Sequence, residues 1–177
     1  IEREFLGSEY KIYDWPEEYL YTKEEGHDWK VVPLYGFGVW NAEYSTTFPK
    51  TIELIRSIPG LRTAIFSKLG PRTELNKHRG WSGLANEALR CHMGIVIPDP
   101  DTKGRSGVAV EDEFRQITKG EWIVFDDSKE HIGVNDTDEN RVVLLLDIER
   151  PWWVKKGESK VQDTPELLDF VAKFTRV

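Results

Sequence analysis

The chain has 177 residues, of which 39% are hydrophobic and 31% charged, and this composition is typical of a soluble globular protein with a sizeable core. A net charge of −7 without a basic tail or patch argues against strong binding to nucleic acid or to an anionic membrane, because both depend on clustered Lys and Arg. One cysteine excludes an internal disulfide, and no apolar run reaches the roughly 18 residues that cross a bilayer. With no signal peptide at Ile1, we expect a cytoplasmic protein, and a start at Ile rather than Met is compatible with a trimmed N terminus.

Residues 1–60 predict a lead-in followed by a helix. Residues 1–30 are polar and aromatic, which indicates an extended segment or a short helix. Residues 31–40 contain two glycines among apolar side chains and predict a strand with a bulge. A helix is predicted over 48–58, with Thr46 or Thr47 as its cap and Pro49 in its first turn.

Residues 61–150 change to a β pattern, and 151–177 form a tail that ends in a helix. Short apolar or alternating runs separated by turn signals predict strands at 62–69, 89–97, 107–110, 122–125 and 141–148. Many short strands of this kind favour a mainly β sandwich or barrel, and we expect residues 1–177 to form a single domain. The amphipathic stretch 164–174 predicts a last helix, capped by Thr164, with its buried side formed by Leu167, Leu168, Val171 and Phe174.

Two histidines and one arginine carry the strongest chemical signal. His78 lies in a loop before a long strand, His131 follows a strand and a turn, and Arg141 begins the next strand. Two imidazoles can hold a ferrous ion and leave coordination positions open for a co-substrate. An arginine directed into a barrel suits the far carboxylate of a 2-oxo acid, because its planar fork matches a carboxylate. This set predicts an Fe(II) site that uses 2-oxoglutarate.

Arg90 and His92 lie two residues apart in an apolar strand and therefore point to the same face. We expect that face to line the pocket, where the pair could bind a carboxylate of the co-substrate or of the substrate, although a solvent-facing pair is the alternative. Cys91 alternates away from both and is predicted to lie in the core.

Half of the chain, from Ser67 to Pro151, resembles the aspartyl/asparaginyl β-hydroxylase family. The most specific match is the run Phe125-Asp126-Asp127-Ser128 to His131. The other matching pieces are His78-Arg79-Gly80, the run from Leu89 to Pro98, Gly120-Glu121-Trp122, and the run from Arg141 to Ile148.

The resemblance implies a double-stranded β-helix, a jelly-roll or cupin-like fold with flanking α-helices, that binds Fe(II), 2-oxoglutarate and O2. It implies that His78 and His131 are the iron ligands. Ser67 and Arg141 would bind the distal carboxylate of 2-oxoglutarate, and His92 would hold its other end. Arg90 would lie close to both co-substrate and substrate, and is counted with the catalytic residues.

Gly80 stands where the wider oxygenase superfamily has an acidic third ligand, and this family shares that absence. A glycine leaves a coordination position for water, or for the chloride that a halogenase needs, while Glu87 is an alternative acid. Asp126 and Asp127 are expected to fix the turn and orient the ligands. Trp81 is expected near the pocket and His27 on the surface, while Asp147 is expected to face a loop or form a hydrogen bond around the site.

The predicted activity is hydroxylation of an unactivated carbon, with release of succinate and CO2. The expected partner is a small-molecule or peptide substrate, such as an amino acid, an Asp- or Asn-like residue or a metabolite, whose carboxylate could meet Arg90, Arg79 or Lys68. A 2-oxoglutarate-dependent halogenase and a non-catalytic β-barrel that binds metal or small acids remain alternatives.

Overall fold

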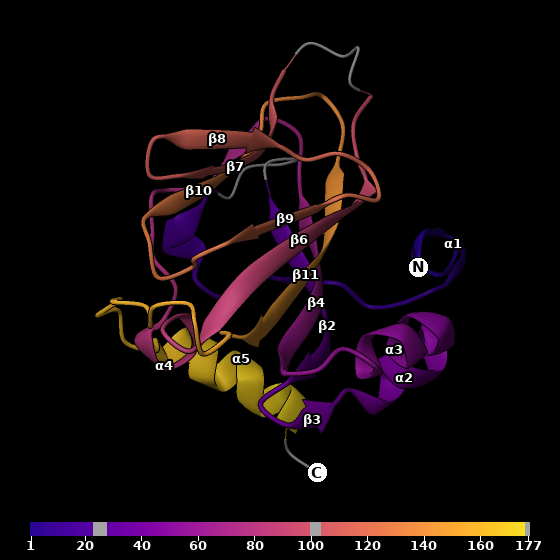
Figure 1. The fold of residues 1–177 in the computed structure, drawn as a ribbon. Helices are drawn as coiled ribbons and strands as arrows, with labels where there is room; N and C mark the ends of the chain where they lie inside the picture. The colour runs from indigo at the N-terminus through magenta and orange to yellow at the C-terminus, as the bar shows by residue number, and fades with distance from the viewer. Residues whose placement is uncertain (23–27, 100–103, 176–177) are drawn as a thin grey trace.

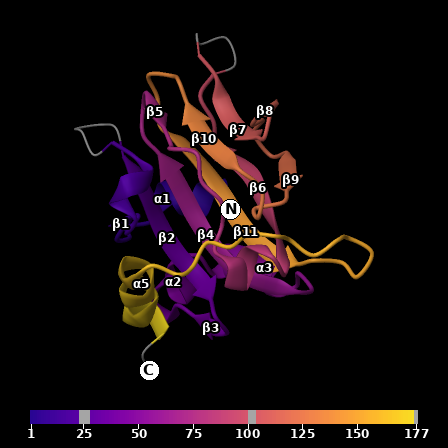
Figure 2. The same ribbon diagram turned by 90° about the vertical axis from the view of Figure 1, so that its left-hand side faces the viewer.

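The computed structural model describes residues 1–22, 28–99 and 104–175, which form two antiparallel sheets with helices around them. Figures 1 and 2 show the larger sheet running through the molecule and the smaller sheet facing one end of it. The mainly β jelly-roll architecture predicted from the sequence is confirmed. His27, which we expected on the surface, lies outside the described residues.

The larger sheet has the strand order β1-β2-β4-β11-β6-β9, with β3 added to β2, and the smaller has the order β5-β10-β7-β8. The bounds in the larger sheet are β1 (Tyr13–Asp14), β2 (Trp29–Gly36), β3 (Val39–Trp40), β4 (Leu61–Leu69), β6 (Ala88–Val96), β9 (Trp122–Phe125) and β11 (Arg141–Glu149). Those in the smaller sheet are β5 (Thr73–Glu74), β7 (Ser106–Val110), β8 (Glu113–Gln116) and β10 (His131–Asn135).

The two faces of the larger sheet have different roles. Alternate residues of β4, β6 and β11, such as Phe66, Cys91 and Leu144, point outward into the main hydrophobic core. The residues between them point to the inner face, toward the smaller sheet, and include Ser67, Arg90, His92 and Arg141. The outer face is therefore apolar, whereas the inner face carries polar side chains among apolar ones such as Val143 and Leu145.

The helices cover the outer face and one end of the barrel (Figure 1). Tyr44, Phe48, Ile52 and Ile55 of the α2–α3 segment pack on the outer face of the sheet. The bounds are α1 (Glu2–Gly7), the 3₁₀ turn η1 (Glu18–Leu20), α2 (Ala42–Thr47), α3 (Pro49–Arg56), α4 (Ser82–Ala85) and α5 (Pro165–Thr175). Among the described residues, no helix combines the length and the apolarity needed to cross a bilayer.

The helix predicted over 48–58 is confirmed as α3, but its predicted cap was wrong, and a short helix that was not predicted, α2, precedes it. Thr46 and Thr47 lie inside α2, where each hydroxyl donates to the Glu43 carbonyl instead of capping the next helix. α2 is capped by Asn41, whose side-chain oxygen accepts from Glu43 N at 3.1 Å. α3 begins at Pro49, as predicted.

The C-terminal helix is confirmed with its predicted cap, and its predicted buried side is correct except for Leu168. The Thr164 hydroxyl accepts from Leu167 N at 3.2 Å. Leu167 and Phe170 are buried, whereas Leu168, which we expected inside, is 55% exposed. A 3.6-residue period is compatible with a buried stripe that contains either Leu168 or Phe170, and the stripe with Phe170 faces the sheet.

Candidate active site

A two-residue backbone bridge brings His78 and His131 together. His78 N donates to His131 O at 3.1 Å, and His131 N donates to His78 O at 2.9 Å. This pairing joins the loop after β5 to the start of β10, so the two side chains leave neighbouring points of the backbone. Their ring centroids lie 4.3 Å apart.

Both imidazoles are oriented by main-chain carbonyls. Nδ1 of His78 is 2.7 Å from Asn76 O, and Nδ1 of His131 is 2.9 Å from Lys129 O. A carbonyl can only accept, so each Nδ1 carries the proton and each Nε2 keeps its lone pair. Burial lowers the pKa of both histidines to about 4, helped at His78 by the neighbouring His131. Two neutral imidazoles are the form that binds a metal.

Asp127 stands next to this pair, in the room that Gly80 leaves free. A Cβ at Gly80 would lie 1.8 Å from Asp127 Oδ2, so the two positions cannot both carry a side chain. Asp127 Oδ1 is 3.2 Å from His131 Nε2, and burial raises the pKa of this carboxyl to about 6. The lone pair of His131 Nε2 and the carboxylate of Asp127 repel each other at that distance, so they need a proton or a cation near them. Part of the room that we expected Gly80 to leave for water or chloride is thus occupied by Asp127. Asp127 was expected to orient the ligands, but it contacts the nitrogen of His131 that would face a metal, while main-chain carbonyls orient the rings.

Arg90 lies between two buried carboxylates on the inner face. Its Nη1 is 2.6 Å from Asp127 Oδ1, and Nε and Nη2 donate to the two oxygens of Asp147 at 2.9 and 3.1 Å. Thr63 donates to Asp147 at 2.5 Å from the next strand. Burial alone would lower the pKa of Arg90, but the two carboxylates more than offset it and raise the pKa. Arg90 thus reaches the site as predicted, already paired with protein carboxylates.

Deeper in the barrel, His92 and Arg141 are buried, and neither has a carboxylate partner in the part of the chain that the structure describes. Within the described residues, neither ring nitrogen of His92 nor Nε of Arg141 has a hydrogen-bond partner. Arg141 Nη1 donates to the carbonyls of Gly107 and Val134, at 2.9 and 3.4 Å. Burial lowers its pKa to about 10 and that of His92 well below its usual value. An unpaired buried guanidinium is costly, so this interior fits an anionic ligand.

Ser67 shares this inner face, and a tryptophan that we had not singled out fixes its hydroxyl. Ser67 lies opposite Val143 in the β4–β11 ladder, and Arg141 is two residues from Val143 on the same side of β11. Trp29 Nε1 donates to Ser67 Oγ at 3.0 Å. The Trp29 ring is also 6.5 Å from His78 between centroids. No local sequence signal connects Trp29 to Ser67, which is 38 residues away.

Several other predicted residues are now placed. Cys91 is buried in the core, as expected, and burial raises its pKa to about 11. Arg79 reaches the cleft beside His78, and its Nη1 donates to Ser128 O at 3.0 Å. The expectation that Lys68 meets a substrate was wrong. Lys68 points away from Ser67 and pairs with Asp28 at 3.5 Å. Glu87 pairs with Lys156, away from the histidines.

Asp126 holds the turn before His131, as predicted. Its Oδ1 accepts from Ser128 N at 3.0 Å and from Ser128 Oγ at 2.6 Å. Arg150 donates to both Asp126 oxygens, at 3.1 and 2.7 Å. Burial of Asp126 would raise its pKa, but these hydrogen bonds outweigh burial and lower it. The turn is therefore fixed independently of any ligand.

A cleft beside His78 lies next to an apolar pocket at the end of the barrel. Trp15, Trp29, Trp81 and Arg90 line both spaces, so the two share a wall. The expectation that Trp81 lies near the pocket is confirmed. Among the described residues, no group of three or more His, Cys, Asp or Glu is arranged to hold a metal ion.

A sequence model of aspartyl/asparaginyl beta-hydroxylases matches residues 1–151. The chain belongs to this family. The match covers the larger sheet, the histidine pair and Arg141, and it ends before α5. The resemblance found in the motifs around His78 and His131 is thereby confirmed.

Two curated relatives show the breadth of the family. The chain is 37% identical over 123 residues to an ornithine lipid ester-linked acyl 2-hydroxylase of Rhizobium tropici, covering 70% of this chain and 42% of that protein. It is 31% identical over 134 residues to the human aspartyl/asparaginyl beta-hydroxylase, covering 73% of this chain and 17% of that protein. The chain thus spans less than half the length of either relative.

Solved structures with a similar fold share little sequence with this chain. One is the cupin domain of an XRE family transcriptional regulator from Enterobacter cloacae, with 13% identity, a TM-score of 0.45, and coverage of 70% of this chain and 98% of that one. Another is KdgF from Halomonas sp., with 14% identity, a TM-score of 0.41, and coverage of 80% and 97%.

Proposed function

We propose that the protein is an Fe(II)- and 2-oxoglutarate-dependent hydroxylase. In this reaction one oxygen atom of O2 converts a substrate C–H into C–OH, and the other is taken up as 2-oxoglutarate becomes succinate and CO2. The observation that carries the proposal is the pair of neutral imidazoles, with ring centroids 4.3 Å apart, beside a buried guanidinium that has no carboxylate partner among the described residues.

The residues present fit both cofactors. His78 and His131 would hold Fe(II), which supplies the redox chemistry of C–H hydroxylation, through nitrogens that their Nδ1 hydrogen bonds leave free. Asp127 Oδ1, 3.2 Å from His131 Nε2, adds negative charge beside that position. Main-chain carbonyls fix both rings, so little reorganisation is needed on binding.

The co-substrate would lie on the inner face between Ser67 and Arg141. Arg141 is 3% exposed and presents its guanidinium to the interior, where a carboxylate would remove its uncompensated charge. The free ring nitrogens of His92 offer a second polar contact. Arg90 holds Asp127 and Asp147 in place, and its charge borders the space shared with the substrate pocket.

Halogenation, the alternative that Gly80 suggested, is less favoured. The room beside Gly80 is taken by the Asp127 carboxyl, and a carboxylate disfavours a neighbouring chloride. A chloride-dependent mass shift of the product would support it. A non-catalytic module remains the second alternative, and binding of Fe(II) and 2-oxoglutarate without any succinate would support that function.

The test is anaerobic loading with Fe(II) and 2-oxoglutarate, followed by exposure to O2 and measurement of succinate with a panel of substrates. We expect the chain to release succinate, and His131→Ala to lose Fe(II) binding and turnover. Arg141→Met should raise the KM for 2-oxoglutarate about 30-fold or more, because truncating one partner of a buried charge pair costs about 2–5 kcal/mol.

Arg115→Met is the matched control, since Arg115 is an exposed arginine on β8. It should leave Fe(II) affinity and the KM for 2-oxoglutarate unchanged. Full activity in both the His131→Ala and the Arg141→Met proteins would refute the site assignment.

A further inference from the structure

The chain between β11 and α5 runs across the molecule before it reaches the last helix, as Figure 2 shows. Residues 157–161 of this segment, here called the strap, form hydrogen bonds with both of the segments that carry the paired histidines. The match to the family model ends at residue 151. The strap therefore lies outside the part of the chain that the family model covers.

On one side, the strap bonds to the loop that follows the first histidine. Ser159 Oγ donates to Gly80 O at 2.6 Å, and Ser82 N donates to Val161 O at 2.8 Å. The Asn86 side chain accepts from Ser159 N at 2.7 Å and donates to Ser159 O at 3.0 Å. These bonds hold the loop at several points between Gly80 and Asn86.

On the other side, the strap meets the turn before His131. Glu158 N donates to Ser128 Oγ at 3.3 Å. Gly157 approaches the same serine so closely that a Cβ at position 157 would lie 2.6 Å from Ser128 Oγ and 2.8 Å from Asn86 Cα. Gly157 N also donates to Asn86 O at 3.0 Å. The strap thus lies between the two histidine-bearing segments and contacts both.

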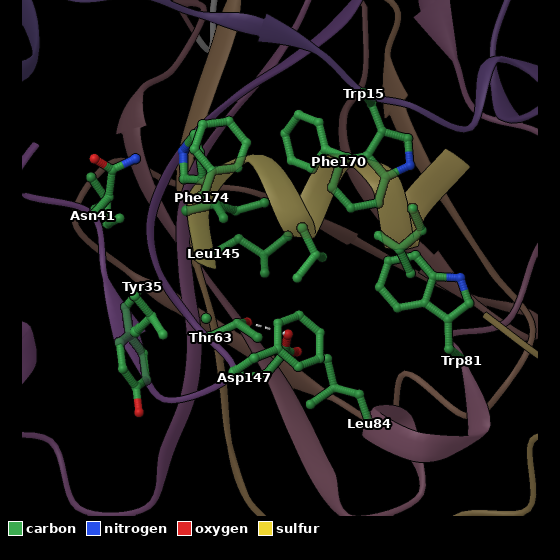
Figure 3. Close-up of a pocket in the computed structure, with 18 of the residues that line it drawn as sticks. Trp15, Tyr35, Asn41, Thr63, Trp81, Leu84, Leu145, Asp147, Phe170 and Phe174 are labelled. Atoms are coloured by element: carbon green, nitrogen blue, oxygen red, sulfur yellow. Dashed lines mark hydrogen bonds between the residues drawn. The ribbon is translucent and has the colours of Figure 1, made fainter. Parts of the chain in front are cut away.

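The buried carboxylate of Glu17 anchors the chain just after the strap. Glu17 is 2% exposed, and its Oε1 accepts from Thr164 Oγ1 at 2.9 Å and from Trp81 Nε1 at 3.2 Å. Figure 3 shows Trp81, Trp15 and Phe170 of α5 around the apolar pocket, and the Trp15 centroid is 5.8 Å from that of Trp81 and 6.2 Å from that of Phe170. Trp81 is therefore joined to the start of α5 by polar and aromatic contacts.

The contact between Ser159 and Gly80 is buried. Ser159 is 5% exposed, and its hydroxyl also accepts from Val161 N at 3.3 Å. A buried carbonyl that loses its donor is costly, because water does not take the donor's place. Gly80 is only two residues from His78, so a shift of the Gly80 peptide also displaces the histidine.

We infer that the strap is a positioning element for the histidine pair, which holds His78 at the distance from His131 that binding of one metal ion needs. The inference rests on the proposed function, because it concerns the affinity of that site for Fe(II). A loop that is held in place before binding loses less conformational entropy on binding, and this raises affinity. Arg141 bonds to carbonyls outside the strap, so the effect belongs to the metal and not to 2-oxoglutarate.

Ser159→Ala tests the contact with the loop of the first histidine. We expect the Kd for Fe(II), measured by anaerobic titration, to rise about tenfold, as for other residues that orient metal ligands. The KM for 2-oxoglutarate at saturating Fe(II) should stay at the parent value. In the metal-free chain, amide hydrogen exchange of residues 78–82 should speed up, while the amides of β4 and β11 keep their parent rates.

Gly157→Ala tests the contact with the turn before the second histidine, because its methyl group would collide with Ser128 and displace the strap. The Kd for Fe(II) should rise here as well. Gly7→Ala is the matched control, since a Cβ at Gly7 meets nothing within 4 Å. Ser57→Ala is the control for the serine, because Ser57 Oγ also donates to a carbonyl at 2.6 Å, that of Leu54 at the exposed end of α3. Both controls should keep the parent Kd.

Ile55→Val separates positioning from a general loss of stability. Ile55 is 1% exposed in the main core, and removal of one methylene there lowers the stability of the whole chain. This variant should keep the parent Kd for Fe(II), even where urea unfolding shows a deficit as large as that of Ser159→Ala. Circular dichroism checks that every variant folds, and Ser159→Ala carries the test if Gly157→Ala does not.

The outcomes separate this inference from the proposed function. Strap variants that bind Fe(II) like the parent chain, or that lose no more affinity than Ile55→Val, overturn the inference and leave the proposed function intact when the parent releases succinate. Fe(II) binding that depends on the strap, without succinate from any substrate, overturns the proposed function and leaves the inference intact.

Discussion

At the scale of single residues, the Asp127 carboxyl occupies a small volume beside the histidine pair that Gly80 leaves free. Asp127 reaches toward His131 only because residue 80 has no side chain, since a Cβ there would also lie 2.8 Å from Ala85 Cβ. The conformational freedom of Gly80 is not the reason for a glycine here. The reason is the close approach of Asp127.

Substitution of Gly80 by alanine should therefore damage the site through overpacking. The new methyl group collides with Asp127 and Ala85, and we expect a loss of about 1–3 kcal/mol in the free energy of unfolding. Because Asp127 also contacts Arg90, Fe(II) affinity should fall as well. Urea unfolding and anaerobic Fe(II) titration measure the two effects.

Gly83→Ala is the control for this change. Gly83 lies in α4, and a Cβ at that position meets nothing within 4 Å. It should leave the free energy of unfolding unchanged or raise it by less than about 1 kcal/mol. Equal stability of the Gly80→Ala and Gly83→Ala proteins would contradict the steric explanation.

At the scale of elements, α3 is capped by a residue of another helix. Glu4 of α1 accepts hydrogen bonds from Lys50 N, Thr51 N and Thr51 Oγ1 at 2.8, 2.8 and 2.6 Å. A carboxylate at a helix N terminus satisfies free amides and interacts favourably with the helix dipole. The cap joins α1 to α3, and both pack on the outer face of the sheet.

Glu4→Gln should reduce the free energy of unfolding by about 1 kcal/mol near neutral pH. Burial would raise the pKa of Glu4, but the hydrogen bonds to Thr51 and Lys50 outweigh it and lower the pKa. A lowered folded-state pKa means that the stabilisation is present above the ordinary glutamate pKa and is lost as pH falls through the folded-state value. The difference between parent and variant should thus disappear in acid, as urea unfolding at several pH values would show.

Glu53→Gln serves as the control, because Glu53 is an exposed carboxylate on α3 itself. This variant should have the stability of the parent chain at each pH. A Glu4→Gln deficit that persisted at low pH would argue against the charged cap.

At the scale of the whole molecule, the barrel keeps unsatisfied polar groups in its interior at the expense of stability. His92 and Arg141 are both less than a tenth exposed, and their free nitrogens face the inside of the barrel. Groups left in this state lower the stability of the ligand-free protein until a ligand compensates them. Ligand binding and folding are therefore coupled.

Fe(II) and 2-oxoglutarate, added together without O2, should raise the melting temperature. At concentrations about a hundred times Kd the gain is about 2.7 kcal/mol per ligand, or roughly 5–10 °C for a chain of this size. Anaerobic calorimetry measures it. In the Arg141→Met protein, Fe(II) alone should still raise the melting temperature, while 2-oxoglutarate should add little. An unchanged melting temperature in the parent chain would count against both cofactors.

Local pattern was enough to predict β4, β6, β7, β9, β11 and part of the site, but not β1, β5, β8 or β10. Alternation gave β4, apolar runs gave β6 and β11, and residue spacing put Arg90 and His92 on one face, because these signals depend only on neighbouring positions. The same rule would have excluded Lys68, which follows the inward-facing Ser67. Two further features involve residues close in sequence to the motifs. They are the turn held by Asp126 and Arg150 and the carbonyls that orient the histidines.

Long-range polar partners could not be predicted in this way. Glu17 lies in a stretch that looks like a polar lead-in, yet it is buried by donors from three parts of the chain. Asp147 belongs to an aliphatic strand, and its partners Arg90 and Thr63 come from the strands on either side. Such contacts depend on tertiary register, which residue periodicity alone does not contain.

The main-chain bridge between His78 and His131 also makes the site suitable for chemical rescue. Since the two backbones bond to each other, deleting the His78 side chain should leave position 131 in place and open a hole shaped like the missing ring. Free imidazole diffusing into His78→Ala protein could then restore succinate release, whereas the larger 2-phenylimidazole should not. A variant that stays inactive at saturating imidazole, with Fe(II) present, would mean that the covalent link to the backbone is itself required.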